Sequence, residues 1–468
     1  MKTNAVNRHL GRPRRQIPGW LMVPAVGAAL STIMLVMLVA IPVLSPGTGA
    51  FVADALRAVA GPTPVAMLES VSSRIQDVVN RLRYEATGGQ PQLTWTTETL
   101  PALTPSLPDV GGVAPAAPAA SPGIVAPSQG QSPSQGQAPS LGQAPSQGQA
   151  PSQGQVSGGE ASAQPAQHSM VGGAALVPLN PPPDVVADPP VLSAGWQAFG
   201  PLMDGKPVMA RTSLKPDPSR AYAQAAVVRI DLTRTRLHLV AGTVEPIAAP
   251  GTPRFPRPGV IPADVQTAGS LLAAFNGGFK AVNGHYGMMV DGVTILPPID
   301  NLATLALYQD NSVRIGAWGR DITLSPDLVA YRQNCPLLVD AGQVNPAVND
   351  GSRAEWGSTV HNLDTTWRSG LGISRDGQFL IYAVGNSLTV QSLADALQTA
   401  GAYYAMQLDI NGAFTIFDTF QPAQNAQSSS PVVAVKLVHE MVGGPRQFLV
   451  PDKRDFFYVT AAPVSGPR

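Results

Sequence analysis

Two segments of the sequence end an apolar run with a polar side chain and glycine. Leu271–Phe275 leads into Asn276-Gly277-Gly278, and Tyr404–Leu408 leads into Asp409-Ile410-Asn411-Gly412. A buried strand that ends in this way presents its amide or carboxylate at the edge of a sheet, where glycine lets a ligand approach the backbone closely. We therefore expect both segments to form walls of one pocket.

A third segment supplies a cation. Arg368 lies between Asp364-Thr365-Thr366-Trp367 and Ser369-Gly370-Leu371-Gly372, just before a glycine-flanked apolar run. The planar guanidinium of arginine matches phosphate or carboxylate, so Arg368 is a candidate anion clamp. A surface ion pair with Asp364 is the alternative, and spacing alone does not separate the two. His285 and His361 are candidate helpers, although a surface or buried structural histidine fits the same positions.

The composition argues against several other chemistries. The chain carries 30 Lys+Arg and 30 Asp+Glu, so its net charge is zero and it lacks the basic excess typical of nucleic-acid binding. Its one cysteine, Cys335, excludes an intramolecular disulfide, and the apolar residues around it indicate a small buried side chain. No spacing of ligand-type residues predicts a metal or another cofactor, and only Asp300, Asp310 and Asp321 leave a calcium site in loops open.

These side chains must be positioned by strands, and the C-terminal part of the sequence contains many segments that predict strands. One helix is predicted there, with Ser387 or Thr389 as its N-cap and Gly401 at its end. Strands outnumber helices without a regular alternation, so we predict an α+β fold with a mixed β-sheet core and few flanking helices. Apolar and β-branched runs bounded by turn formers predict strands at 226–240, 271–275, 287–290, 371–373, 379–384 and 403–408.

At these residues the sequence resembles the phosphodiester glycosidase family. The resemblance rests on Asn276-Gly277-Gly278-Phe279, on Arg368–Gly372 followed by Asp376-Gly377, and on Gln407-Leu408-Asp409 after a helix that ends at Gly401. The order of these motifs, within residues 226–459, is more specific than any one of them. The family includes the mammalian uncovering enzyme, which removes N-acetylglucosamine from a phosphodiester, and bacterial exported proteins linked to surface polysaccharide. The resemblance implies hydrolysis of a sugar-1-phosphodiester at the anomeric carbon.

Two motifs depart from the family pattern. The family usually has Asn-Gly-Gly-Phe-Phe, and here Lys280 replaces the second Phe. The family's Asp-Gly-Gly-Gly-Ser is here Asp409-Ile410-Asn411-Gly412-Ala413, in which Ile410 narrows access to the backbone and Ala413 lacks a hydroxyl donor. The aspartate is retained, so the carboxylate that the chemistry needs is present.

The resemblance and the chemistry of the bond together imply roles for these residues. A glycoside normally needs one carboxylic acid to protonate the leaving group and a second carboxylate, whereas a phosphate monoester already leaves readily. Asp409 is therefore expected as base or nucleophile, Arg368 as the cation that offsets the phosphate charge, and Asn276 as a ligand of a sugar hydroxyl. A second carboxylate could come from Asp364, Asp340 or Asp291. The expected substrate-binding residues are Gly277, Gly278, Asn411, Gly412, Asp364 and His285.

The N-terminal part of the sequence predicts where the domain works. Residues 1–16 contain basic residues but no acid, and residues 17–45 are almost wholly apolar. That length suffices for a helix to cross a hydrocarbon layer of about 30 Å, and the positive-inside rule then places the N-terminus in the cytoplasm and the remainder outside. A cleaved signal peptide is the alternative, but its apolar region usually runs only about 7–15 residues.

Two segments connect this anchor to the domain. Residues 46–85 contain a predicted helix at Pro64–Tyr84, and residues 86–191 carry six-residue repeats without stackable hydrophobic residues, as expected of a disordered linker rich in Pro, Gly, Gln and Ser. The apolar spacing of this helix covers only two heptads, which is fewer than a coiled coil needs. Two interpretations therefore stay open: an ordinary amphipathic helix, or weak self-association along an apolar seam. The seam would consist of Leu68, Val71, Ile75, Val78 and Leu82.

Residues 192–468 make up the predicted phosphodiester glycosidase-like domain. The whole sequence predicts a membrane-anchored, extracytoplasmic hydrolase that cleaves sugar-1-phosphodiester bonds in surface or wall glycans. A non-catalytic carbohydrate-binding or wall-associated module on the same fold is the alternative, favoured by Ile410 and Ala413.

Overall fold

The computed structural model describes residues 62–89, 93–96, 195–203, 205–267, 269–349, 355–357, 365–423 and 430–462. The predicted basic segment 1–16, the anchor 17–45 and most of the linker 86–191 lie outside these described residues, as do Asp364 and His361. Within the described ranges, no helix combines the length and the apolar character needed to cross a membrane. The anchor at 17–45 therefore stays a prediction.

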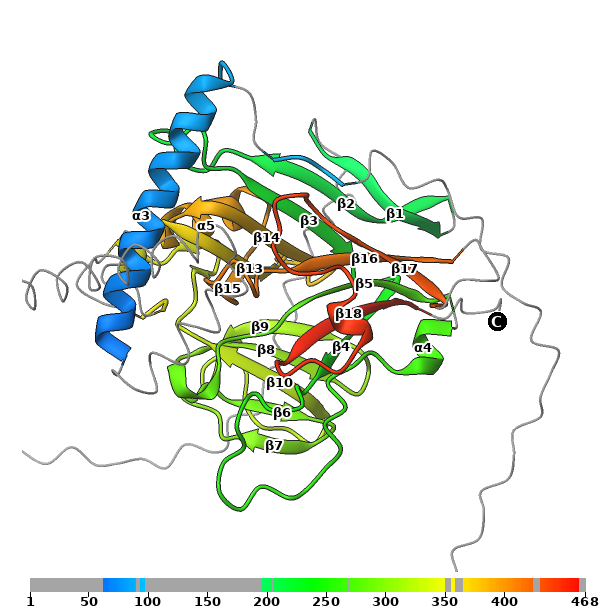
Figure 1. The fold of residues 1–468 in the computed structure, drawn as a ribbon. Helices are drawn as coiled ribbons and strands as arrows, with labels where there is room; N and C mark the ends of the chain where they lie inside the picture. The colour runs from blue at the N-terminus through cyan, green and yellow to red at the C-terminus, as the bar shows by residue number, and fades with distance from the viewer. Residues whose placement is uncertain are drawn as a thin grey trace, which may run out of the picture. The chain divides into compact units, whose positions relative to one another are not determined.

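The described residues of the domain form three β-sheets and few helices (Figure 1), which confirms the predicted fold class in its coarse form. The eight-stranded sheet has the order β1 (Gln197–Met203), β2 (Lys206–Leu214), β3 (Ala225–Asp231), β14 (Phe379–Leu388), β13 (Thr366–Ile373), β15 (Tyr404–Gln407), β11 (Val339–Asp340) and β12 (Gln343–Val344). One five-stranded sheet has the order β7 (Val293–Leu296), β6 (Met288–Val290), β10 (Leu328–Asn334), β8 (Ala303–Tyr308) and β9 (Val313–Ala317). The other has the order β17 (Val432–Lys436), β16 (Phe417–Pro422), β5 (Leu271–Asn276), β18 (Phe456–Ala461) and β4 (Thr235–Val240). The helices of the described residues are α3 (Pro62–Ala86), α4 (Ala263–Thr267) and α5 (Val390–Thr399), with short 3-10 turns η1 (Ala281–Asn283), η2 (Pro346–Asn349) and η3 (Gln447–Leu449).

Three strands carry the segments that the sequence singles out. β5 ends at Asn276 and every one of its residues is buried, because it lies between β16 and β18 in the middle of its sheet. β15 ends two residues before Asp409 and pairs antiparallel with β13, which carries Arg368. The predicted strands at 271–275 and 403–408 are thus confirmed within one residue at each end, and the strand predicted at 371–373 begins five residues earlier.

Helix α5 covers one face of the eight-stranded sheet at β13 and β14 (Figure 1). Its N-cap is Thr389, whose hydroxyl accepts a hydrogen bond from the Ser392 backbone in a capping box. Gly401 follows its C-terminus with a φ of +98°, a left-handed conformation that glycine adopts without strain. Of the two predicted N-caps, the structure therefore selects Thr389, and the predicted stop at Gly401 is confirmed.

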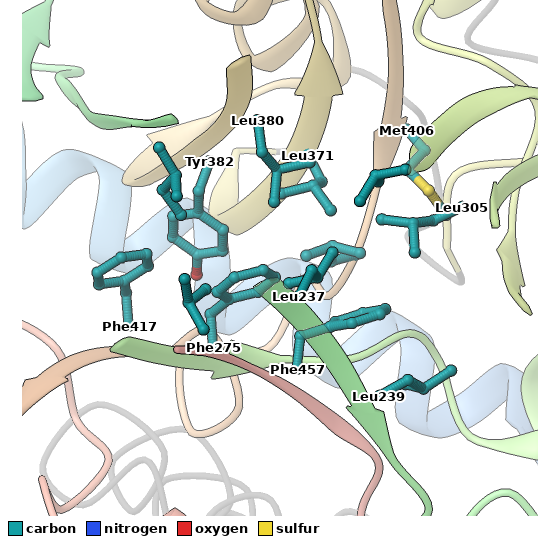
Figure 2. Packing of buried hydrophobic residues seen from close by; sticks show 14 of the residues in the cluster. Leu237, Leu239, Phe275, Leu305, Leu371, Leu380, Tyr382, Met406, Phe417 and Phe457 are labelled. Atoms are coloured by element: carbon teal, nitrogen blue, oxygen red, sulfur yellow. The ribbon is translucent and has the colours of Figure 1, made fainter. Parts of the chain in front are cut away.

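Aromatic rings fill the core between the eight-stranded sheet and the sheet of β5. Figure 2 shows Phe275, Tyr382, Phe417 and Phe457 gathered there, and the Phe275 ring centroid lies 5.2 to 5.8 Å from the other three. All four residues are fully buried. Such a packed cluster holds the end of β5, and with it Asn276, in a fixed position relative to β14.

Helix α3 extends two residues beyond the predicted Pro64–Tyr84 at each end. Its Asn80 is buried and donates from Nδ2 to Ser387 Oγ at 2.8 Å, and its Asp77 accepts from Tyr222 at 3.0 Å. These bonds hold one face of the helix against the end of β14 and the turn before β3. The four described seam residues are 40–57% exposed, namely Val71, Ile75, Val78 and Leu82.

Candidate active site

Asn276 is a buried side chain whose hydrogen bonds connect β5 to β13 and β14. Its Oδ1 accepts hydrogen bonds from the Tyr382 hydroxyl and the Ile416 amide, and its Nδ2 donates to Ser369 Oγ and the Gly277 carbonyl. Burial raises the pKa of Tyr382 well above its usual range, so this phenol stays a neutral donor that fixes the orientation of the amide. With 7% of its surface exposed, Asn276 chiefly positions the loop that follows.

The two glycines after Asn276 are required by a buried ion pair. Arg332 Nε lies 2.8 Å from Asp455 Oδ2, and both side chains are 1% exposed. A Cβ at Gly277 would overlap the Asp455 carboxylate, and one at Gly278 would lie 2.9 Å from Arg332 Cζ. The sequence predicts that these glycines admit a ligand, and the structure gives them a packing reason as well.

The carboxylate of Asp409 is held by three N–H donors. Oδ1 accepts from the backbone amides of Ile410 and Asn411 at 2.8 and 2.9 Å, and Oδ2 accepts from Arg454 Nη2 at 2.6 Å. Asp409 is 3% exposed, whereas the Arg454 side chain is 12% exposed. The acid is thus oriented by its own loop and by one arginine.

Ser369 joins the two predicted walls. Its hydroxyl accepts from Asn276 Nδ2 at 3.0 Å and from the Asp409 backbone amide at 3.1 Å. The Asp409 carbonyl accepts from the Ser369 amide at 2.8 Å. The structure therefore brings Asn276 and Asp409 together, as the two strand-end motifs predict, through a serine that the sequence analysis did not assign a role.

Arg368 does not contact the Asp409 carboxylate. It is completely buried, with Nε donating to the Leu388 carbonyl and Nη1 to Gln407 Oε1 and the Trp356 carbonyl. Successive residues of a strand point to opposite faces, so Arg368 lies on the α5 face of β13 while Ser369 faces Asp409. The sequence predicts Arg368 as the cation that offsets the phosphate charge, whereas the arginine that contacts Asp409 is Arg454.

Arg454 is the functional candidate that sequence reasoning missed. Its Nη2 also donates to the Gly278 carbonyl at 2.8 Å, and its Cζ lies 4.3 Å from the centroid of the Phe414 ring. Arg454 thereby connects both predicted walls. The available signal was the charged run 452–455 directly before the apolar strand β18. A charged residue just before a strand lies at the edge of the sheet, as a polar residue just after a strand does.

Of the remaining predicted site residues, two lie in the loop after Asp409 and the others lie in other turns or ion pairs. Asn411 Oδ1 caps its own turn by accepting from Ala413, and a Cβ at Gly412 would lie 2.7 Å from the Trp367 ring, so both shape the loop after Asp409. His285 is exposed in the turn after η1, with a φ of +51°. Asp340 is ion-paired with Arg320 at 2.7 Å. Asp291 is exposed with a φ of +50° in the turn between β6 and β7.

A small surface pocket lies beside these groups. Asp452 and Asp455 contribute carboxylates to its wall, and Asp452 Oδ1 accepts from the Arg454 backbone amide at 2.8 Å. Asp409 contacts the pocket wall through its bond to Arg454. The lining residues are Asn276, Gly277, Phe414, Gln447, Phe448, Asp452, Arg454 and Asp455.

Cys335 is fully buried, and burial raises the pKa of its thiol to about 12. A thiol with such a pKa is protonated at neutral pH and is a poor nucleophile. Across the described part of the chain, no group of three or more His, Cys, Asp or Glu side chains is arranged to hold a metal ion.

Comparison with known proteins bears out the resemblance. Residues 269–432 match the phosphodiester glycosidase family, a span that includes Asn276 and Asp409. No curated protein matches the sequence.

The solved structures that are similar to this chain include three at low identity. The catalytic domain of zebrafish N-acetylglucosamine-1-phosphodiester alpha-N-acetylglucosaminidase, auto-inhibited by its pro-peptide, is 15% identical, with 57% of this chain and 88% of that chain covered and a TM-score of 0.37. A hypothetical protein from Synechocystis is 13% identical, with coverage of 56% and 64% and a TM-score of 0.35. A putative exported protein from Burkholderia pseudomallei is 11% identical, with coverage of 52% and 74% and a TM-score of 0.26.

Proposed function

We propose that this chain, whose residues 269–432 match the phosphodiester glycosidase family, is a glycosidase-type hydrolase of sugar-1-phosphodiesters. The observation that carries the proposal is the carboxylate of Asp409. It is oriented by three N–H donors, and one of them, Arg454, lines a pocket together with Asn276 and Gly277.

In the proposed reaction, the bond between the anomeric carbon and the phosphate oxygen breaks. Its electron pair leaves with the phosphate monoester, and the oxygen of water bonds to the anomeric carbon. Asp409 either takes the proton of the attacking water or attacks first and is released by water in a second step. The phosphate monoester leaves as an anion, so no carboxylic acid has to protonate it.

The test is hydrolysis of a sugar-1-phosphodiester by the full-length chain, with free sugar as the readout. We expect Asp409→Asn to lower kcat/KM by about 1,000-fold, because the amide is neither a base nor a nucleophile. Asp327→Asn is the matched control, since Asp327 is exposed and lies outside the pocket wall. Equal release of sugar by the wild type and by Asp409→Asn contradicts the assignment.

A non-catalytic glycan-binding module is the second candidate. It is favoured by the small exposure of Asp409, 3%, and by Ile410, which packs against a buried cluster where the family has glycine. Saturable binding of a glycan without release of sugar or phosphate would support this module over the hydrolase.

We also propose that residues 17–45 anchor the chain in a membrane with the domain outside, and that surface or wall glycans are the substrates. The basic residues before this apolar run and the six-residue repeats after it support the proposal. Protease added to intact cells should then remove the domain and leave the N-terminal segment. Protection of the domain until the cells are broken would contradict it.

A further inference from the structure

A short segment that the sequence assigns to the linker is bound to the domain. Residues 93–96 belong to the described part of the chain. Trp95 forms an isolated antiparallel bridge with Val438, and the His439 amide donates to the Thr94 carbonyl at 2.9 Å. These backbone bonds add the segment to the folded domain as a short strand-like piece.

The segment contacts residues of two different sheets. The Leu93 amide donates to Oε1 of Gln224, which lies just before β3 of the eight-stranded sheet, at 3.4 Å. At the other end of the segment, Thr96 Oγ1 donates to the carbonyl of Lys436, the last residue of β17 in the sheet of β5. The segment therefore connects these two sheets from outside the core.

The side chain of Trp95 packs on a buried arginine. Its ring centroid lies 4.7 Å from Cζ of Arg211, and the Phe199 ring centroid lies 5.0 Å from the same atom. Arg211 is 3% exposed, and burial lowers the pKa of its guanidinium. A cation–π contact is strongest where the cation is withdrawn from water. Since Leu93 and Trp95 also pack against the core cluster around Phe275, Trp95 should contribute more than its neighbours to binding of the segment.

Both ends of the remaining linker lie on the same strand. Arg211 of β2 contacts Trp95, and the next residue of β2, Thr212, donates from Oγ1 to the Gly195 carbonyl at 2.9 Å. Residues 97–194 thus begin and end at neighbouring positions of β2. A connection whose two ends are held together is a loop, and the entropy cost of closing a loop grows only slowly with its length.

We propose that residues 62–89 and 93–96 form an arm of the domain, fastened by helix α3 and by a strap of residues 93–96, so that the linker is a loop on the domain and not its tether. Helix α3 (Figure 1) supplies the second attachment, through the buried bond of Asn80 to Ser387. Two attachments on one chain hold more firmly than either alone, because the second binds at a high effective concentration. The inference does not rest on the proposed hydrolase activity.

The arm also bears on the proposed membrane anchor. If residues 17–45 anchor the chain, only residues 46–61 separate the anchor from the start of α3 at Pro62. An extended chain of that length spans at most about 55 Å. The length of the linker then has no influence on how far from the membrane the domain works.

The experiment cuts the linker of the full-length chain and asks whether the two fragments stay together. The chain carries an affinity tag at its N-terminus and a specific protease site inserted after Gly142, and it is immobilised through the tag in mild detergent. We expect most of the C-terminal fragment to stay bound after cleavage, because the arm holds it without a covalent connection. The same site inserted after Gly49 is the matched control, since cleavage there separates the tag from the arm and the domain together. Denaturing electrophoresis verifies cleavage in both chains.

Two substitutions in the strap sharpen the test. Trp95→Ala loses the contact with Arg211 and should raise the dissociation rate of the cut fragment about 30-fold. Thr94→Ala should leave that rate within about twofold, because Thr94 is exposed and bonds through its backbone. Release of the cut wild-type fragment as complete as in the Gly49 control overturns the arm. Equal dissociation rates for Trp95→Ala and Thr94→Ala overturn the strap.

Discussion

Arg368 and Arg454 belong to the same neighbourhood of the molecule but have opposite environments. Arg368 is 0% exposed on the α5 face of β13, and its bonds go to oxygens within the fold. Arg454 lies before β18, reaches the Asp409 carboxylate, and retains donors toward a pocket. The comparison teaches that a buried guanidinium that donates to oxygens of the fold stabilises the fold. A guanidinium with only some of its donors engaged is available for a ligand.

The largest expected effect is on stability, at Arg368. Arg368→Ala leaves the Leu388 carbonyl and Gln407 Oε1 without their donor and opens a cavity, so it should lower the free energy of unfolding by about 4 kcal/mol. Arg254→Ala, at an exposed position, is the control. Urea unfolding followed by circular dichroism measures both. A midpoint equal to that of the wild type would erase the distinction between the two arginines.

The second expected effect is on activity, at Arg454. Arg454→Gln removes the cation from Asp409 and should lower kcat/KM by about 100-fold, close to what loss of one preorganised donor costs in other enzymes. Because the side chain is partly exposed, the free energy of unfolding should fall by only about 1 kcal/mol. If stability collapses while the folded fraction keeps its activity, Arg454 is a structural residue like Arg368.

The strand-end motifs could be predicted from sequence because their positions depend only on residues that are neighbours along the chain. A run such as Leu271–Phe275 is apolar on both faces, so it belongs in the middle of a sheet, and the polar residue that ends it must lie at the edge. The same argument placed Asp409. Ser369 then joins the two motifs across 93 and 40 residues of sequence.

The partner of Asp409 could not be predicted in this way. Arg368 and Ser369 are adjacent, and only the register of β13 decides which of the two faces the acid. Arg454 is 45 residues from Asp409 and reaches it because β18 pairs with β5 in another sheet. Such contacts depend on how sheets pack, which periodicity does not encode.

A third buried polar residue extends the comparison. Within the described residues it is hydrogen-bonded neither to oxygens of the fold, as Arg368 is, nor to a charged partner, as Arg454 is. Asp418 on β16 is 0% exposed, and within the described ranges neither of its carboxylate oxygens has a hydrogen-bond partner. Burial raises the pKa of Asp418 well above its usual range, and the nearby Lys436 opposes this shift in part. The carboxyl is therefore kept in its neutral form by its surroundings.

The pH dependence of stability tests this state of Asp418. A carboxyl whose pKa is higher in the folded than in the unfolded chain contributes stability that is complete below the unfolded pKa of about 3.9 and is lost as the pH rises toward the folded pKa. Asp418→Asn should remove that loss and raise the free energy of unfolding by about 1–2 kcal/mol at pH 7, with little change near pH 3.5. Urea unfolding at both pH values measures the difference. A lower stability of Asp418→Asn at pH 7 would mean that the folded chain uses the ionised carboxylate of Asp418.

The smallest expected effect extends the same contrast between buried and exposed side chains to helix α3. Asn80 is buried and bonded to Ser387, whereas Val78 is 55% exposed two residues earlier. Asn80→Ala should lower the free energy of unfolding by about 1.5 kcal/mol because Ser387 loses a buried partner, and Val78→Ser should change it by less than about 0.5 kcal/mol. If the seam of Val71, Ile75, Val78 and Leu82 supports weak self-association, Val78→Ser should also lower the mass measured by sedimentation at high concentration. An unchanged mass would assign these side chains to an ordinary amphipathic helix, since a stripe that binds a second copy must respond to a polar group at its centre.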